Sequence, residues 1–407
     1  MKKKISVIIP VFNRREILKK TLLRIKNQQL EDEEYEIILV DDGSTEDLPS
    51  VVSSLQLSSV VKIVKIKEKT SNRSLLRNIG ADHSAGEVLI FLDSDIMIMS
   101  RTLENHYNEA KNGFVSLGYN VFSKHVSNEY PFQFSDLNIN DYELDYRPFG
   151  LINEVATTPF VFRHCTTGNL ALQRKHFDLI GGFDESFTEW GFEDTEFGYR
   201  LWKNNIEFVY NKSASAIHHP HLRHISENNP YLRMGRHFLK IHPVLEVEIY
   251  VSGYYKSFIE HIELANTITQ SLRHNRTNNT MKFPFEPDLL VGSSEMPMQA
   301  AKKKISLLHE SAPDFCLFGL GLPYDDGEIE SLVISPYWRY LPIDILNRLL
   351  YEAFRVSKRV WIQTLQSSSN YTYWKGQIAD LKLVGSDSIT FIPVNGSVEN
   401  FELVLIK

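Results

Sequence analysis

Apolar and polar positions follow two different periods along the first part of the chain. Short runs rich in β-branched residues alternate with longer segments in which apolar residues recur three and four positions apart, as Leu18, Leu22 and Ile25 do. The first pattern predicts buried strands and the second predicts amphipathic helices. The expected strands are residues 5–10, 35–40, 60–66 and 88–92. This β-α-β-α-β-α-β order indicates an α/β fold with a mostly parallel sheet, right-handed crossovers and helices on both faces.

Three of the expected strands end in polar loops. Ligands of open parallel sheets bind outside the carboxyl ends of the strands, so we expect the three loops to converge on one rim. The loops are Pro10-Val11-Phe12-Asn13, Asp41-Asp42-Gly43-Ser44 and Asp93-Ser94-Asp95.

The pattern changes after the fourth strand. Residues 113–163 are rich in aromatic, Asn and Asp residues, and we expect them to form an excursion over the sheet. Residues 165–211 return to dense apolar order, with a strand over 207–210. Residues 213–242 are rich in His, Asn and Pro, which predicts surface.

The last part of the chain has a pattern of its own. The expected elements are a helix within 244–273, a linker over 274–297, strands at 331–335 and 360–364, and a helix over 343–355. The runs 389–394 and 401–406 flank Asn395-Gly396, which predicts an antiparallel hairpin. The predicted organisation is an α/β domain over 1–235, a helical segment and linker over 236–301, and a smaller C-terminal α/β domain over 302–407.

Composition and charge narrow the class of function. The chain has 407 residues, 43% of them apolar, and a formal net charge of −7. The acidic balance argues against a nucleic-acid partner, which needs a broad basic surface. Cys165 and Cys316 have no metal-ligand spacing and predict structural thiols in a reducing cytoplasm. The opening apolar run is interrupted at Asn13, which makes it too short for a signal peptide or a transmembrane segment. Peripheral contact with a membrane stands as an alternative.

Two carboxylates, Asp93 and Asp95, directly follow a predicted buried strand. Holding two like charges together there is costly unless a cation lies between them. Mn²⁺ or Mg²⁺ prefers hard oxygen ligands and keeps positions open for substrate phosphates, so this loop can bridge a diphosphate. An Asp-x-Asp pair alone is also typical of a solvated turn, which stands as the alternative.

Further motifs accompany this loop in a fixed order. They are Ser6-Val-Ile-Ile-Pro-Val-Phe-Asn-Arg14, Val40-Asp-Asp-Gly-Ser-Thr45, Arg77-Asn-Ile-Gly80, Thr167-Gly168-Asn169, Gly181-Gly182-Phe183-Asp184-Glu185 and Trp190-Gly-Phe-Glu-Asp-Thr-Glu-Phe-Gly-Tyr-Arg-Leu201. With them the chain resembles the family 2 glycosyltransferases of the GT-A fold, over residues 4–222. The last motif is most similar to the galactosyl- and N-acetylgalactosaminyltransferase and polysaccharide-synthase branch. The resemblance implies a Rossmann-like mixed sheet that binds a nucleotide-diphosphate sugar.

The same resemblance implies a donor site on the rim. Phe12 would lie against the uracil ring of a UDP-sugar, and Asp41 would accept a hydrogen bond from the base, with Asp42 as the alternative at that loop. Arg77 would reach the base or the diphosphate, unless it is a helix-surface arginine. The remaining donor-binding residues are Pro10, Asp93, Ser94, Gly168, Asn169 and Trp190. For Gly168 and Asn169 a tight turn is the alternative.

The metal site implied by the resemblance combines carboxylates with a histidine. Asp95 would be the firmest metal ligand, and Asp93 would bind the ribose or the metal. His218 is the first choice for a further ligand, with His219 and His221 as close alternatives. A histidine cluster is also typical of a surface loop.

Direct attack by an acceptor hydroxyl on the donor sugar needs a base. The resemblance places the base at Asp194 and lets Glu193 orient the acceptor. The two lie at a predicted helix start, where backbone N–H groups favour negative charge and Trp190 and Phe192 would exclude water. The alternative is that both carboxylates only cap a helix over 195–201. A single displacement would invert the anomeric carbon.

The C-terminal domain loosely resembles the second half of a Rossmann-type methyltransferase. The resemblance depends on the run Asp314-Phe-Cys-Leu-Phe-Gly-Leu-Gly-Leu-Pro-Tyr-Asp-Asp-Gly327 and on the strands, helix and hairpin that follow it. No strand followed by a Gly-x-Gly-x-Gly loop precedes it in the sequence. We therefore expect a degenerate, non-catalytic module that docks an acceptor or a partner.

Three functions compete at this point. The first is a hexosyl- or N-acetylhexosaminyltransferase, as in polysaccharide biosynthesis, that moves a sugar from a UDP-sugar to a glycan, lipid-linked or small-molecule acceptor with Mn²⁺ or Mg²⁺. The second is a non-catalytic module that binds glycans or nucleotide sugars on a GT-A scaffold. The third is a protein that also methylates, which would require S-adenosylmethionine binding by residues 302–407.

Overall fold

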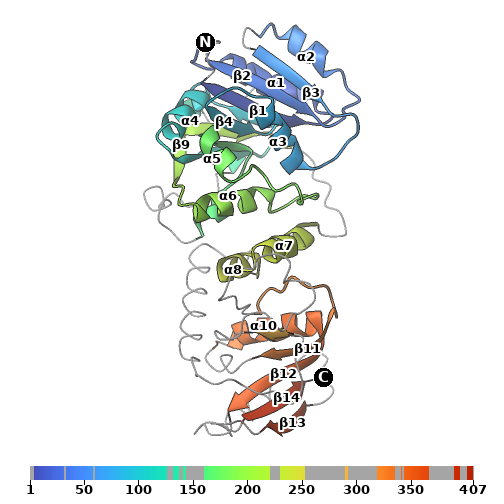
Figure 1. The fold of residues 1–407 in the computed structure, drawn as a ribbon. Coiled ribbons are helices and arrows are strands. Elements are labelled where there is room, and N and C mark those ends of the chain that lie inside the picture. The colour runs from blue at the N-terminus through green and yellow to red at the C-terminus, as the bar shows by residue number, and fades with distance from the viewer. Residues whose placement is uncertain are drawn as a thin grey trace. The chain divides into compact units, whose positions relative to one another are not determined.

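The computed structural model divides into two compact units, Met1–Met234 and Gly235–Lys407 (Figure 1). The described residues are 4–31, 34–57, 60–125, 131, 133–136, 141–143, 160–220, 230–252, 289–291, 319–334, 341, 343–365, 389–394 and 401–406. Among them, no helix combines the length and the apolar character that a membrane span requires.

Unit 1 is built on a nine-stranded sheet with the order β3-β2-β1-β4-β8-β6-β9-β5, and β7 pairs with β6 beside this path. The strands are β1 (Ile5–Val11), β2 (Tyr35–Asp41), β3 (Val60–Lys65), β4 (Val88–Leu92), β5 (Ile96–Ile98), β6 (Val115–Ser123), β7 (Tyr142–Glu143), β8 (Asn169–Gln173) and β9 (Phe208–His218). The predicted parallel pairing is confirmed for β1 to β4. Beyond β4 the sheet is mixed, since β8 runs antiparallel to β4 and β5 antiparallel to β9.

Helices cover both faces of this sheet (Figure 1). One layer holds α1 (Arg15–Lys26), α2 (Leu48–Ser54) and α4 (Thr102–Ala110), and the other holds α3 (Arg73–Asp82), α5 (Arg174–Leu179) and α6 (Glu193–Lys203). Side chains alternate along β1, so that Val7 and Ile9 join the first layer and Ile8 joins the second. Because both faces are packed with apolar side chains, the polar loops are left at the ends of the strands.

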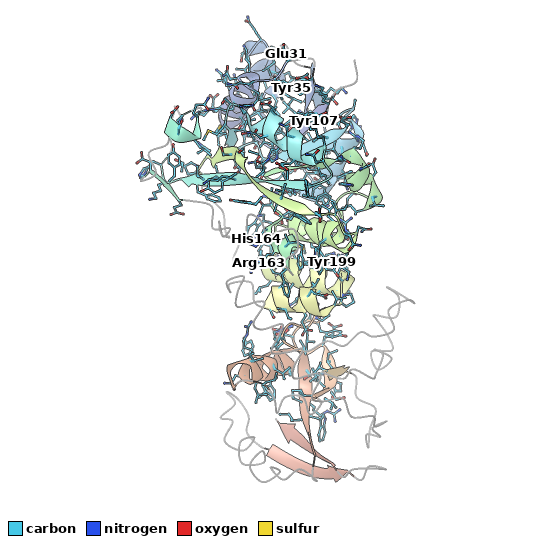
Figure 2. All side chains as sticks on the ribbon, turned by 90° about the vertical axis from the view of Figure 1, so that its left-hand side faces the viewer. Glu31, Tyr35, Tyr107, Arg163, His164 and Tyr199 are labelled. Carbon is cyan, nitrogen blue, oxygen red and sulfur yellow. The ribbon has the colours of Figure 1, made fainter. Side chains whose placement is uncertain are left out.

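A short 3₁₀ helix, η4 (Val161–His164), fixes the position of α6. The ring of Phe162 meets Tyr199 of α6 edge-on at a centroid distance of 5.3 Å. Figure 2 shows Arg163, His164 and Tyr199 at this junction. The close approach needs Gly198, since a Cβ there would lie 2.4 Å from the Cβ of Cys165, a buried free thiol. Gly198 and Tyr199 therefore let α6 pack directly against η4 and Cys165.

Two predictions about the loops of unit 1 are wrong. Residues 115–123, expected within an excursion, form β6 between β8 and β9 in the sheet. The alternation of Val115, Leu117, Tyr119 and Val121 is a strand pattern, which the aromatic and Asn-rich residues around it obscured. The expected surface stretch after residue 213 is also partly interior, because β9 continues to His218 and α7 (Pro230–Ile241) follows.

Unit 2 contains a five-stranded sheet with the order β10-β11-β12-β14-β13. Its elements are α8 (Leu245–Ser252), β10 (Leu289–Val291), β11 (Ile329–Ile334), α10 (Ile343–Val356), β12 (Ser357–Leu365), β13 (Ile389–Val394) and β14 (Phe401–Ile406). β10, β11 and β12 are parallel, and the predicted antiparallel pairing of β13 with β14 is confirmed. Asn395 and Gly396, the predicted turn, lie outside the described residues.

A buried carboxylate organises the loop before β11. Glu248 of α8 is fully buried, and its Oε1 accepts hydrogen bonds from the backbone N–H groups of Gly319 and Leu320 at 2.6 and 2.8 Å. Gly319 has a φ of +103°, a conformation that favours glycine. The N–H of Gly321 also points to Glu248 Oε1, at 3.4 Å, and the N–H of Leu322 donates to Oε1 of Glu352 at 2.8 Å. The carboxylates of Glu248 and Glu352 thus accept hydrogen bonds from a run of backbone N–H groups of the kind that binds anions.

Candidate active site

The loops after β1 and β2 are held together by Asn13. Its backbone N–H donates to Ser44 Oγ at 2.9 Å, and its side-chain Oδ1 accepts from the N–H of Thr45 at 2.9 Å. Asn13 has a φ of 46°, which Asn tolerates better than most residues. These reciprocal bonds bring the first two polar loops together, as the strand order predicts.

Two adjacent aspartates in the second loop have different partners. Asp41 is buried, and its Oδ1 accepts from the N–H of Ser44 at 2.8 Å. Asp42 reaches the segment before α3 and accepts from the N–H groups of Thr70 and Ser71 at 2.7 and 2.9 Å. Asp42 therefore fixes the segment that leads into α3, and Asp41 shapes its own loop.

Phe12 lies on the same rim beside a cation. Lys69 Nζ is 4.1 Å from the centroid of the Phe12 ring. A cation over an aromatic face is a favourable arrangement. A base that stacked on this face of Phe12 would have to share it with Lys69.

The loop after β4 presents its two carboxylates differently. The Asp93 side chain is 42% exposed, whereas that of Asp95 is 4% exposed and forms an ion pair with Arg14. Asp93 N–H donates to the carbonyl of Gly168 at 3.1 Å, and a Cβ at residue 168 would lie 3.0 Å from Asp93 Oδ2. The carbonyl of Ser94 accepts from Thr21 Oγ1 at 2.7 Å. Asp93 thus faces the rim, and Ser94 and Asp95 anchor the loop.

Arg77 joins two acidic segments that are far apart in the sequence. Its side chain is 3% exposed, with Nη2 3.3 Å from Asp93 Oδ1 and Nη1 3.5 Å from Glu193 Oε1. This burial excludes a helix-surface arginine. The two acidic loops therefore face the same region of unit 1.

The acid pair begins α6 after a strained turn. Gly191 and Phe192 have φ values of +117° and +66°. Glu193 Oε2 accepts from the N–H of Gly191 at 3.1 Å, and Asp194 Oδ1 accepts from the N–H of Thr195 at 2.8 Å. Both carboxylates thus satisfy local N–H groups at the helix start, in part as the capping alternative predicts, while Glu193 also reaches Arg77.

The surroundings of Asp194 favour its neutral form. Burial and then the adjacent charge of Glu193 raise the pKa of Asp194 to about 7, against the opposing effect of Arg77. Asp93 raises this pKa further, which places its charge within electrostatic reach of Asp194. A carboxylate whose pKa lies near neutral pH can both accept and release a proton there, which is the property a general base needs.

The candidate histidines lie next to the acidic loop through the pairing of β5 with β9. His218 pairs with Ile96, and the N–H of His219 donates to the carbonyl of Asp95 at 2.9 Å. The ring of His218 lies 5.3 Å from that of Phe122, and His219 is 4% exposed. His221 lies outside the described residues.

Asn169, expected to line the sugar pocket, lies in the interior of unit 1. Asn169 is fully buried, and its amide bonds to His106 Nε2 at 2.9 Å and to Asn120 and the carbonyl of Ala214 at 3.1 Å each. Burial lowers the pKa of His106 to about 4, so His106 is neutral in this network. Asn169 satisfies buried polar groups between strands, a role that depends on pairings the sequence does not reveal.

Trp190 is 48% exposed. Its ring lies 5.5 Å from that of Tyr231 at the start of α7, and the Tyr231 ring lies 4.3 Å from that of Phe192, tilted by 37°. Glu189 forms an ion pair with Arg233 beside them. The aromatic side chains of Trp190 and Phe192 thus lie next in sequence to the acid pair. Pro10, another predicted donor residue, is half-buried near the end of β1.

Two cations of the rim, Arg14 and Lys69, were not among the predicted site residues. Arg14 closes the first motif and lies directly after the loop that ends β1, so its place beside the carboxyl end of β4 follows from the strand order. Lys69 had no comparable signal, because it lies between β3 and α3 among other lysines.

The residues present fit a divalent cation that shares its ligands with a phosphate. Among the residues that the structure describes, no three His, Cys, Asp or Glu side chains gather into a complete metal site. Cations at phosphates commonly use one or two protein carboxylates and complete their shell with substrate oxygens and water. Asp93 faces the rim and Asp95 lies two residues away, which gives the hard oxygen donors that such a cation prefers.

Unit 1 is thus a mixed α/β domain with an acidic rim at the carboxyl ends of its first strands. Residues 6–178 match the family model described as glycosyl transferase family 2, and residues 147–225 match the one described as N-terminal domain of galactosyltransferase. These matches cover most of unit 1 and show its similarity to family 2 glycosyltransferases. Both matches end by residue 225, so they give the methyltransferase resemblance of the C-terminal part no support.

Individual proteins show the same similarity. The chain is 28% identical over 264 residues to validoxylamine A glucosyltransferase of Streptomyces hygroscopicus subsp. limoneus, covering 60% of this chain and 58% of that protein. It is 28% identical over 238 residues to chondroitin synthase of Pasteurella multocida, covering 53% of this chain and 24% of that protein. The structure of S. aureus TarS 1–349 in complex with UDP-GlcNAc is similar with a TM-score of 0.47 and 16% identity, covering 66% of this chain and 76% of that one. This chain thus spans little more than half of the first relative and about a quarter of the second.

Proposed function

We propose that unit 1 transfers a hexosyl or N-acetylhexosaminyl group from a UDP-sugar to an acceptor hydroxyl, with inversion at the anomeric carbon. The observation that carries this proposal is the position of Arg77, which contacts Asp93 of one acidic loop and Glu193 of the other. A leaving diphosphate at the first loop and an attacking hydroxyl at the second would then lie on one rim. The similarity to a glucosyltransferase and to a chondroitin synthase supports the same class of reaction.

The donor would lie along the loops after β1, β2 and β4. The Phe12 ring offers a face for uracil, and Asp41 in the adjacent loop offers a carboxylate oxygen to the base N–H. Asp93 and Asp95, with His218 as a further ligand, would hold Mn²⁺ or Mg²⁺ at the diphosphate. The cation would neutralise the negative charge that the leaving UDP gains.

The acid pair would act on the acceptor. Asp194 would accept the proton of the acceptor hydroxyl as its oxygen bonds to the anomeric carbon and the bond from that carbon to UDP breaks. The pKa of Asp194 of about 7 suits this transfer near neutral pH. Glu193, which is held by Arg77 and by the N–H of Gly191, would orient the acceptor. The acceptor would be a glycan, a lipid-linked glycan or a small molecule.

A screen of nucleotide sugars tests this proposal. The full chain would be mixed with UDP-sugars, Mn²⁺ and candidate acceptors, and UDP release and product mass would be measured with and without chelator. We expect metal-dependent release, and Asp95→Ala should weaken metal-dependent donor binding. Tight donor binding without hydrolysis or transfer to any acceptor would instead support the non-catalytic binding module.

A further inference from the structure

Asp95 has a cation of the chain itself as a partner. Arg14 Nη1 pairs with Asp95 Oδ2, and the two side chains are 32% and 4% exposed. Arg14 follows Asn13, whose bonds to Ser44 and Thr45 fix the loop after β1. The guanidinium is therefore presented to the acidic loop from a fixed backbone position.

Burial explains why Asp95 needs such a partner. A carboxylate removed from water is costly unless a positive group or several donors compensate its charge. The guanidinium of Arg14 supplies that charge. A divalent cation that bound Asp95 would meet this guanidinium, and the two positive groups would repel each other.

A donor diphosphate on this rim offers the Arg14 guanidinium a second negative partner besides Asp95. Its oxygens accept hydrogen bonds from the planar guanidinium of an arginine. Their negative charge can replace that of Asp95 as the partner of the Arg14 guanidinium. We propose that Arg14 is a resident counter-ion of Asp95 that transfers to the donor diphosphate when the cation and the donor bind. This inference rests on the proposed function, and it assigns to Arg14 a role in coupling the two ligands.

The coupling has a measurable consequence. The cation alone must compete with Arg14 for Asp95, so it binds weakly without the donor. With the diphosphate present, Arg14 contributes to donor binding and no longer opposes the cation. Cation and nucleotide should therefore bind with positive cooperativity, and each should raise the affinity of the other by the same factor.

Replacing Arg14 should move the two affinities in opposite directions. Mn²⁺ binding would be measured by the loss of the free-ion paramagnetic signal, and UDP binding by calorimetry in the presence of Mn²⁺. In Arg14→Gln we expect Mn²⁺ alone to bind about 3- to 10-fold more tightly, and UDP about 10-fold more weakly, than in the unchanged full chain.

Arg15→Gln is the matched control. Arg15 is the neighbouring residue with the same charge, its side chain is 49% exposed, and its ion pair is with Glu16 at 3.8 Å. It should leave both affinities within about twofold of the unchanged chain. Equal behaviour of the two variants, or a parallel fall of both affinities in Arg14→Gln, would overturn the inference.

Arg14→Lys covers the case in which Arg14→Gln does not fold. Lysine keeps the positive charge but lacks the fork, so Mn²⁺ alone should bind as in the unchanged chain while UDP binds less tightly. Unchanged UDP binding in Arg14→Lys would contradict a diphosphate contact through the fork. If the unchanged chain shows no Mn²⁺-dependent UDP binding, the proposed function itself fails. If the unchanged chain binds UDP in a Mn²⁺-dependent way but the Arg14 variants do not show the expected affinities, only the role of Arg14 is rejected.

Discussion

Arg77 Nη1 lies 3.5 Å from Glu193 Oε1, although more than a hundred residues separate them along the chain. The same guanidinium reaches Asp93, so one buried cation is shared between the loop after β4 and the start of α6. Because Arg77 also lowers the pKa of Asp194, it affects both ends of the proposed reaction.

Replacing Arg77 should change the pH dependence of transfer as well as its rate. In Arg77→Gln the pKa of Asp194 loses the opposing cation and should rise further above about 7. We expect transfer at pH 7 to fall about tenfold or more and to recover in part at higher pH. Arg73→Gln, on an exposed face of the same helix, is the control. An acid limb at the same pH in both variants would contradict the shared role of Arg77.

The rate of transfer should depend on the ionisation of Asp194. A base with a pKa of about 7 is protonated at lower pH, so activity should fall as the pH drops through 7. Asp194→Asn should retain donor binding and lose transfer by roughly 10²-fold or more, with no acid limb in what remains. Glu207→Gln, at an exposed position, should behave like the unchanged chain. Undiminished transfer in Asp194→Asn would exclude this residue as the base.

Asp194 should also limit the stability of unit 1 at neutral and alkaline pH. Its folded-state pKa of about 7 is above the ordinary value of 3.8, so the folded state binds the proton more tightly. The ionised side chain is therefore destabilising, fully above pH 7 and not at all below about pH 4. At pH 8 the free energy of unfolding should be higher in Asp194→Asn than in the unchanged chain by about 2 kcal/mol or more. This difference should disappear as the pH falls. Thermal unfolding at several pH values measures the difference, and equal advantage at pH 8 and pH 4 would speak against it.

Gly168 should be required for the position of Asp93. The Cβ of Gly168→Ala would lie 3.0 Å from Asp93 Oδ2, which forces this carboxylate to move by a few tenths of an ångström. We expect weaker Mn²⁺-dependent UDP binding, by about tenfold, with little change in melting temperature. Gly321→Ala is the control, because its Cβ would meet nothing nearer than 3.5 Å. Equal donor affinity in the two variants would argue against a tight fit at Asp93.

Glu248 should stabilise unit 2 and leave the chemistry of unit 1 unaffected. Glu248→Ala removes the acceptor for the N–H groups of Gly319 and Leu320, and we expect a loss of about 2 to 4 kcal/mol in the unfolding free energy of unit 2. Hydrogen exchange of the Gly319 loop would report the change. Mn²⁺-dependent UDP binding should be unchanged. Unaltered protection of the loop would show that the carboxylate contributes little.

Much of the fold follows from local pattern. The strands β1, β2 and β4 and the helix α10 lie within a residue or so of their predicted bounds, because their apolar runs have a clear period. β6 was missed because the aromatic and polar residues around it hide its alternation. The place of Asn169 also escaped prediction, because its partners His106, Asn120 and Ala214 come from three other segments.

By itself, the sequence of this protein determined the α/β class, the order of its first strands and the loops that meet at their carboxyl ends. It did so because periodicity and turn residues act over a few neighbouring positions. Only the tertiary structure decided which charges compensate one another: that Arg77 serves both Asp93 and Glu193, that Arg14 pairs with Asp95, and that Asn169 is interior. Such pairings depend on burial and on distances between segments remote in the chain, and electrostatic energy in a protein is set by those two quantities.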